Sequence, residues 1–148
     1  MLKMASKKQE NIFNRQDNQM REVIKHLNLN DEFYTQEGCH ITELSNTSDD
    51  PGLSIARARV APGVTTRWHR LCGITERYYI IQGKGIMEVE NLPPQEVNAG
   101  DVVLIPPLCR QRIINSGMDD LIFLAICTPR FHNDAYEDIE GKNGISDF

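Results

Sequence analysis

The sequence has no long hydrophobic run, and no stretch approaches the roughly 20 apolar residues that a membrane-spanning helix requires. The first ten residues carry positive charge but lack the apolar segment of a secretory signal peptide. Basic residues are also outnumbered by acidic ones, with a formal net charge of -5 and no long run of either sign. That balance argues against a nucleic-acid partner. We therefore expect a cytoplasmic protein that contacts neither a membrane nor nucleic acid.

The sequence also lacks paired cysteines. Its four cysteines form no C-x-x-C pair and no zinc-ribbon spacing. In a cytoplasmic protein the natural interpretation is free thiols rather than disulfides. The four positions are Cys39, Cys72, Cys109 and Cys127.

The domain organisation is simple, because no repeat, linker or change of composition divides the 148 residues. This length is enough for one domain with a proper core. We expect a flexible amino-terminal segment over residues 1–17, a single domain over residues 18–140, and a flexible tail over residues 141–148. Between about Asp17 and Leu27, apolar residues recur at helical spacing and predict a short amphipathic helix that packs on the outside of a sheet. The apolar positions of that helix are Met20, Val23, Ile24 and Leu27.

From Cys39 onward the apolar residues alternate with a period of two, which is typical of half-buried strands. Clusters of Gly, Pro, Asn, Asp and Ser separate the alternating segments and mark turns. Many short strands joined by polar turns predict an all-β sandwich or barrel. The expected strands cover approximately residues 39–44, 53–60, 65–70, 76–82, 85–89, 102–105, 111–115 and 121–127.

Two motifs within the strand region contain the candidate residues for catalysis or metal binding. In the first, Gly63, His69, Glu76 and Gly83 follow one another at fixed spacing, with Leu71 two positions after the histidine. His and Glu are both able to bind a metal ion, and the alternation places them on neighbouring strands.

The second motif follows about 25 residues later and contains Gly100, Pro106 and Asn115. Leu108 and Gln111 lie between the proline and the asparagine. Together the two motifs resemble the two signature motifs of the cupin superfamily, in the expected order and at the expected distance. Leu71 and Gln111 replace two histidines of the usual pattern, and Leu108 replaces a glycine.

The resemblance covers roughly residues 53–129 and implies a cupin double-stranded β-helix, a jelly-roll barrel. The full fold prediction is therefore all-β, one cupin barrel with a short amino-terminal helix. More narrowly, the sequence is similar to small single-domain bacterial cupins in its Glu76-Arg-Tyr-Tyr79 run and its closing Ile126-Cys-Thr-Pro-Arg-Phe131 run.

The resemblance also implies a divalent transition metal at the barrel mouth, held in other cupins by three histidines and a glutamate. Here His69, Glu76 and the amide oxygen of Gln111 are the candidate ligands, suited to Fe, Mn, Ni or Zn. Leu71 cannot ligate, which favours the alternative of a metal-free polar cluster in an apolar pocket. The sequence leaves both alternatives open.

Strand alternation extends the list of residues that face the interior. If His69, Glu76 and Gln111 point inward, then so do Arg67 and Tyr78. Arg67 could clamp a substrate carboxylate or phosphate, or it could lie near the rim of the barrel and pair with Glu76 or with solvent. The predicted apolar lining comprises Leu71, Ile80 and Ile113.

Two functions follow as hypotheses. The resemblance implies an enzyme that acts on a small polar organic molecule, with dioxygenase-, isomerase- or lyase-type chemistry and with His69, Glu76 and Tyr78 as catalytic groups. Substrate contacts are then assigned to Arg67, Gln111, Leu71 and Ile113. The alternative is a metal-free ligand-binding or sensor module without catalysis. Because the segment 121–127 is apolar on both faces and similar cupins are commonly dimeric, we also expect a homodimer.

Overall fold

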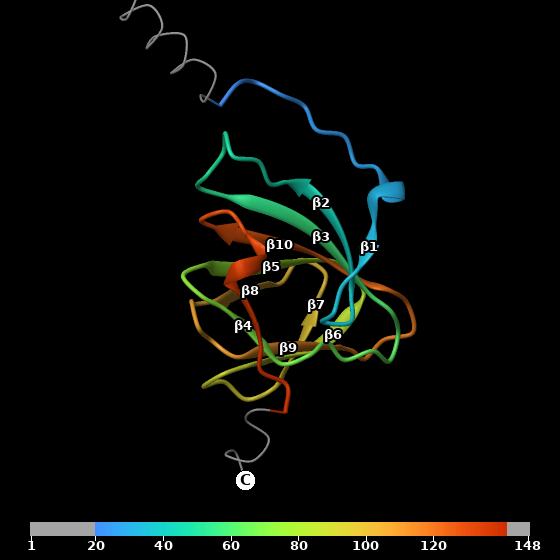
Figure 1. Cartoon of the computed structure of the whole chain (residues 1–148). Coiled ribbons are helices and arrows are strands. Elements are labelled where there is room, and N and C mark those ends of the chain that lie inside the picture. Colours follow the sequence, from blue (N-terminus) through green and yellow to red (C-terminus); the bar gives the residue numbers. More distant parts are fainter. Residues whose placement is uncertain (1–19, 142–148) are drawn as a thin grey trace, which may run out of the picture.

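The computed structural model of the chain describes residues 20–141 (Figure 1). The two ends that the sequence predicts to be flexible lie outside this range, apart from Gly141. Within the described range, no helix is long and apolar enough to cross a membrane.

The predicted amino-terminal helix is wrong where it can be checked. Residues 20–28 form no regular secondary structure, and residues 17–19 lie outside the described range. The four apolar side chains of the supposed helix are all exposed and are not buried against the barrel: Met20, Val23, Ile24 and Leu27. A helix this short is marginal in water without such packing. The first turn is instead the short 3₁₀ helix η1, Leu29–Asp31, which the Asn28 side chain caps by accepting a hydrogen bond from the backbone N–H of Asn30.

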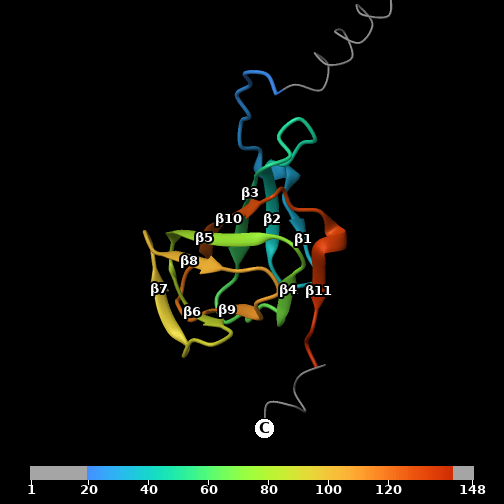
Figure 2. The same cartoon turned by 90° about the vertical axis from the view of Figure 1, so that its left-hand side faces the viewer.

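Eleven strands of the described region form two antiparallel sheets that face each other (Figures 1 and 2). The six-stranded sheet has the order β1 Phe33–Tyr34, β2 His40–Ser45, β3 Ser54–Val60, β10 Leu121–Thr128, β5 Thr75–Gln82 and β8 Val102–Ile105. The five-stranded sheet has the order β11 Tyr136–Asp138, β4 His69–Leu71, β9 Gln111–Asn115, β6 Lys84–Val89 and β7 Gln95–Asn98. A second 3₁₀ turn, η2 Asn133–Ala135, precedes β11.

The prediction of an all-β barrel is confirmed. Seven predicted strands correspond to β2, β3, β5, β6, β8, β9 and β10 within one or two residues. The expected strand over 65–70 is shorter and shifted, because regular pairing begins only at His69 and Thr65 forms a single isolated bridge with Ile114. The short strands β1, β7 and β11 were not predicted.

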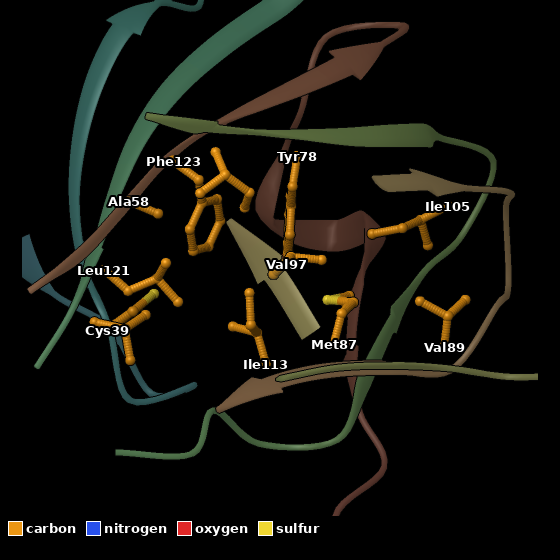
Figure 3. Close-up of a cluster of buried hydrophobic side chains, with 12 residues drawn as sticks. Cys39, Ala58, Tyr78, Met87, Val89, Val97, Ile105, Ile113, Leu121 and Phe123 are labelled. Atoms are coloured by element: carbon orange, nitrogen blue, oxygen red, sulfur yellow. The ribbon is translucent and has the colours of Figure 1, made fainter. Parts of the chain in front are cut away.

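The core fills the space between the two sheets (Figure 3). Tyr78 of β5 and Phe123 of β10 point inward from one sheet, and Met87 of β6 and Ile113 of β9 point inward from the other. Ile80 of β5 is fully buried in the same cluster. The rings of Tyr78 and Phe123 are in contact, with centroids 4.2 Å apart. Alternation along the strands therefore places the apolar residues inside, as the sequence predicts.

The motif asparagine and glycine are structural. The buried Asn115 side chain donates hydrogen bonds to the carbonyl oxygens of Val60 and Asp119, both at 2.8 Å, and accepts one from the Gly117 N–H. It thereby joins β9 to the end of β3 and to the turn before β10. Gly83 has a φ of +85°, and a Cβ there would lie 2.9 Å from the Asp120 carbonyl oxygen, so only glycine fits this turn.

The outer face of the six-stranded sheet carries a second set of apolar side chains. Tyr79 and Ile81 of β5 point away from the barrel, as alternation predicts, and both are exposed. Val102 and Leu104 of the neighbouring edge strand β8 are more exposed still, at 64% and 62%. Nothing in the described chain covers these four side chains.

Candidate functional site

A cavity of about 620 Å³ opens into the barrel beside the apolar core. Its wall is formed by β1 and the turn that follows it, by inward-facing residues of β2, β3, β4, β5 and β10, and by the segment around η2. This size is within the usual range for small-molecule sites. The predicted residues His69, Leu71, Glu76 and Tyr78 all line it.

The polar end of the cavity is organised by a residue that the sequence analysis missed, Glu37. Its carboxylate Oε2 lies 3.2 Å from Nε2 of His69, and its Oε1 accepts a hydrogen bond from the Cys39 thiol at 3.1 Å. The His69 side chain is almost fully buried, whereas 19% of the Glu37 side chain is exposed. The pair therefore lies between the barrel interior and the cavity opening.

The backbone of Arg67 fixes both members of this pair. The Arg67 N–H donates to the Glu37 carbonyl oxygen at 2.9 Å, and Nδ1 of His69 lies 2.7 Å from the Arg67 carbonyl oxygen. A carbonyl only accepts, so Nδ1 of His69 must carry a proton. In a neutral imidazole Nε2 would then be an acceptor, facing a carboxylate that also only accepts. One further proton must lie between His69 and Glu37 to make their contact favourable.

Glu76 of β5 is more deeply buried than Glu37. Its Oε1 accepts a hydrogen bond from Nε2 of Gln111 at 2.8 Å, and the Cys127 thiol lies 3.6 Å from its Oε2. Burial raises the pKa of the Glu76 carboxyl, and the nearby His69 only partly offsets this effect. The group therefore favours its neutral form more than an exposed glutamate does.

Tyr78 lies two positions along β5 from Glu76 and faces the same cavity. The residue is only 4% exposed. Burial raises the pKa of Tyr78 well above its usual value, so the hydroxyl keeps its proton.

Arg67 requires a correction, since its side chain does not enter the cavity. It is exposed, and Nε donates to Oδ2 of Asp138 at 2.8 Å on the outer surface. Alternation does not apply here because Arg67 precedes β4, which begins at His69. The alternative, that Arg67 pairs with Glu76 or with solvent at the rim, is wrong in its partner, which is Asp138. Any role of Arg67 in the site is through its backbone.

The other predicted contacts divide into two groups. Leu71 lines the cavity and packs in a small cluster with Ile74, Cys127 and Ala135. Gln111 is fully buried behind Glu76, and Ile113 belongs to the core rather than to the cavity wall. Ile80, predicted as lining, is likewise a core residue.

The predicted ligand set does not fit a metal ion in this arrangement. Gln111 turns its amide nitrogen toward Glu76, so these two side chains bond each other instead of presenting oxygens to a shared ion. The Oε1 atom of Gln111 is buried without a hydrogen-bond partner, but no other strong metal ligand accompanies it. Among residues 20–141, no three His, Cys, Asp or Glu side chains gather closely enough to hold a metal. Leu71 fills the place where another imidazole would complete the set.

The four cysteines are free, as predicted. Cys39 and Cys127 are buried and each directs its thiol at a site carboxylate, Glu37 and Glu76 respectively. Burial raises the pKa of both thiols, so they act as hydrogen-bond donors rather than as thiolate nucleophiles.

Two antiparallel sheets that face each other around one core form a double-stranded β-helix. The chain belongs to the cupin superfamily. The family model of the cupin domain matches residues 56–127. The uncharacterized protein MJ1618 of Methanocaldococcus jannaschii is 33% identical over 110 residues, which cover 73% of this chain and 87% of that protein.

Solved structures agree with this fold. A Klebsiella pneumoniae protein with a double-stranded β-helix domain has a TM-score of 0.64 at 15% identity, over 78% of this chain and 97% of that one. Streptomyces Pac13, described as a nucleoside dehydratase, has a TM-score of 0.65 at 16% identity, over 81% and 92%. A predicted oxalate decarboxylase from Thermotoga maritima has a TM-score of 0.59 at 25% identity, over 66% and 90%. The first two similarities establish the fold alone.

Proposed function

We propose that this cupin acts on a small polar organic molecule by proton transfer, in isomerase- or lyase-type chemistry, with His69 and Glu37 as its acid–base pair. One observation carries the proposal: Nε2 of His69 lies 3.2 Å from Oε2 of Glu37 at the wall of a ligand-sized cavity, a contact that is favourable only with a proton between the two atoms. A proton held between two acceptors can pass to a bound molecule or be replaced by one taken from it.

The other cavity residues would support this chemistry. The Arg67 carbonyl holds His69 in one tautomer and orientation, as acid–base histidines require. Tyr78 keeps a protonated hydroxyl that can donate to a substrate oxygen. Glu76, with its raised pKa, can hold a proton near the same place. Positioned acid–base catalysis of this kind contributes about 10²- to 10⁴-fold in rate.

The metal predicted from the sequence is not part of this proposal, because Gln111 and Glu76 bond each other and Leu71 supplies no ligand. That prediction is decided by the metal content of the purified protein. The known neighbours of this fold include a dehydratase, which is compatible with lyase chemistry in such a barrel.

The test is turnover by chelator-treated protein. Metal-free wild type, His69→Gln and Glu37→Gln are each incubated with a library of small polar metabolites, and products are identified by mass spectrometry. We expect a product with the wild type and a loss of about 10²-fold or more in both variants. The matched control is His132→Gln, since His132 is exposed and outside the cavity lining.

Two results would overturn this function. Turnover that appears only after an ion is restored would make the chemistry metal-dependent. A compound that binds tightly, shown by a thermal shift, without conversion would favour the alternative of a ligand-binding or sensor module.

The cytoplasmic location and the homodimer also remain proposals. The exposed apolar face of β5 and β8 supports the second of these.

A further inference from the structure

The ionisable side chains of the cavity lining include several acidic ones and, apart from His69, no basic one. Three carboxyl groups contribute to it, those of Glu37, Glu43 and Glu76, and no lysine or arginine among the described residues does. Burial raises the pKa of the Glu43 carboxyl, and Asn46 and Arg130 only partly offset this effect. Nε of Arg130 donates to Oδ1 of Asn46 at 2.8 Å. Arg67, the one predicted anion clamp, is bound to Asp138 on the outer surface. An anionic ligand would therefore meet acidic side chains and no lysine or arginine in the lining.

The remaining wall of the cavity is rich in aromatic rings. Six of its lining residues are Phe or Tyr, whereas the whole chain has only nine of these residues, five Phe and four Tyr. Aromatic faces attract cations through their ring quadrupole. The six are Phe33, Tyr34, Tyr78, Phe123, Phe131 and Tyr136.

An unpartnered polar group inside the cavity indicates that a ligand completes the site. Tyr136 lines the cavity, and its hydroxyl oxygen is buried with no hydrogen-bond partner among the described residues. A buried hydroxyl without a hydrogen bond is costly, so it is normally satisfied by water or by a ligand. A ligand acceptor or a ligand N–H group would satisfy it here.

The His69–Glu37 pair presents two acceptors to the same space. Nδ1 of His69 is committed to the Arg67 carbonyl oxygen, which leaves the Nε2 lone pair facing the Glu37 carboxylate. A protonated amine carries several N–H donors, so it can donate to Nε2 and to the carboxylate at once. Such a ligand supplies the hydrogen that the two side chains must otherwise hold as a shared proton.

We propose that the ligand of this cavity is an organic cation: a protonated amine or amidinium group, held at Glu37 and His69, on an apolar body that lies against the aromatic wall. The inference rests on the proposed function only in placing the ligand at the same acid–base pair. It assigns the cavity a substrate class opposite in charge to the one that a clamping Arg67 would select.

Three probes of similar shape test the charge preference: 2-phenylethylamine as the cation, 2-phenylethanol as the neutral analogue and 3-phenylpropionate as the anion. Affinity for each is measured at pH 7 by isothermal titration calorimetry and by ligand-observed NMR. We expect the amine to bind at least about tenfold more tightly than the alcohol, as for a hydrogen bond to a charged group, and the acid to bind most weakly.

Two variants locate the cation. Glu37→Gln removes the proposed anchor, and Glu96→Gln makes the same change of charge on the exposed strand β7, away from the cavity. We expect Glu37→Gln to weaken amine binding by about tenfold or more and Glu96→Gln to leave it unchanged. A thermal melt of each variant confirms that it is folded. The three-probe comparison uses the wild type alone, so it stands even if Glu37→Gln does not fold.

The outcomes separate this inference from the proposed function. Tighter binding of 3-phenylpropionate than of the amine, equal binding of all three probes, or no binding of the amine overturns the cation class, whatever the result for turnover. An amine preference that Glu37→Gln does not reduce also overturns it, because the anchor would lie elsewhere. An amine preference lost in Glu37→Gln, with no conversion of any amine, supports the cation class and counts against proton-transfer catalysis.

Discussion

Nε2 of His69 lies 3.2 Å from Oε2 of Glu37, and both residues are hydrogen-bonded to the main chain of Arg67. The Arg67 N–H holds the turn that carries Glu37, and the Arg67 carbonyl oxygen holds the imidazole of His69. The distance between acid and base is thus set by main-chain atoms, which a side-chain substitution at position 67 leaves in place.

The tautomer of His69 can be measured without knowing the substrate. In ¹⁵N-labelled protein we expect Nδ1 of His69 to be protonated and hydrogen-bonded, because its partner is a carbonyl oxygen. In Glu37→Gln the amide can donate to Nε2, so His69 should keep its proton on Nδ1 and carry none on Nε2. Two-dimensional NMR of the imidazole nitrogens distinguishes these states. An imidazole protonated on Nε2 alone in the wild type would contradict the geometry on which the acid–base pair depends.

The buried Glu76 predicts a pH dependence of stability. Because its pKa is raised in the folded protein, the folded state binds more protons than the unfolded state above about pH 4.3, the unfolded value. The free energy of unfolding must therefore fall as the pH rises through the interval between the unfolded and folded pKa. Glu76→Gln keeps an amide beside Gln111 but removes the ionisable group.

Relative to that of the wild type, the melting temperature of Glu76→Gln should rise between pH 5 and pH 8. In a chain of this size the expected rise is about 3 °C for each kcal/mol of unfolding free energy that the wild type loses over this interval. Glu96→Gln, on exposed β7, serves as the matched control and should follow the wild type at both pH values. A difference between Glu76→Gln and the wild type that is the same at pH 5 and pH 8 would contradict the raised pKa.

The sequence predicts the barrel well because its signal is local. Alternating residues along β5, β9 and β10 report directly which side chains face inward, and turn residues mark where each strand stops. The same rule failed for Arg67, where it was extended beyond the first residue of β4. The helix over 17–27 failed because helical periodicity shows a possible apolar face but not whether any surface is there to cover it.

Glu37 could not be identified from the sequence. It lies in a four-residue turn closed by the bond from the Gly38 N–H to the Thr35 carbonyl oxygen, and a glutamate before a turn glycine is ordinary. Its place in the site depends on a contact with His69, 32 residues further along the chain, which only the closed barrel brings about. The short strands β1 and β11 escaped prediction for a related reason, since two or three residues are too few to show a period.

Asn115, the last residue of the second motif, should be needed for stability and not for chemistry. Asn115→Ala removes two donors and one acceptor, leaving the buried Val60 carbonyl oxygen and two further turn groups without that partner. We expect a loss of at least about 2 kcal/mol in the free energy of unfolding, measured by urea denaturation. Asn98→Ala, on exposed β7, should change it by less than about 0.5 kcal/mol. Equal effects at the two positions would mean that these hydrogen bonds do not hold the turn.

The exposed outer face of β5 and β8 predicts self-association. Tyr79, Ile81, Val102 and Leu104 are apolar and uncovered in the described chain, so a second copy of the chain placed there would remove them from water. In sedimentation velocity at tens of micromolar we expect a dimer for the wild type and a shift to monomer for Leu104→Lys. The control is Leu92→Lys, because Leu92 is similarly exposed but lies in the turn between β6 and β7. A wild type that sediments as a monomer would contradict the dimer.

Leu71→His tests why the barrel lacks a fitting metal site. Residue 71 follows His69 by two positions on β4 and lines the same cavity, so an imidazole there would point toward His69, Glu37 and Glu76. We expect the affinity for Zn²⁺, measured by competition with a chromophoric chelator, to rise at least about tenfold over the wild type. Without metal the variant should be less stable by about 1–3 kcal/mol, because a polar ring replaces a buried leucine.

Leu71→Asn is the control for Leu71→His, since it is polar and close to leucine in size but brings no imidazole. Saturating Zn²⁺ should raise the melting temperature of Leu71→His and leave that of Leu71→Asn unchanged, because an ion stabilises only a folded state that binds it. If the wild type already binds Zn²⁺ as tightly as Leu71→His, then His69, Glu76 and Gln111 must rearrange around an ion. The bond between Gln111 and Glu76 would then describe only the metal-free state, and the acid–base pair would have to be reconsidered as part of a metal centre.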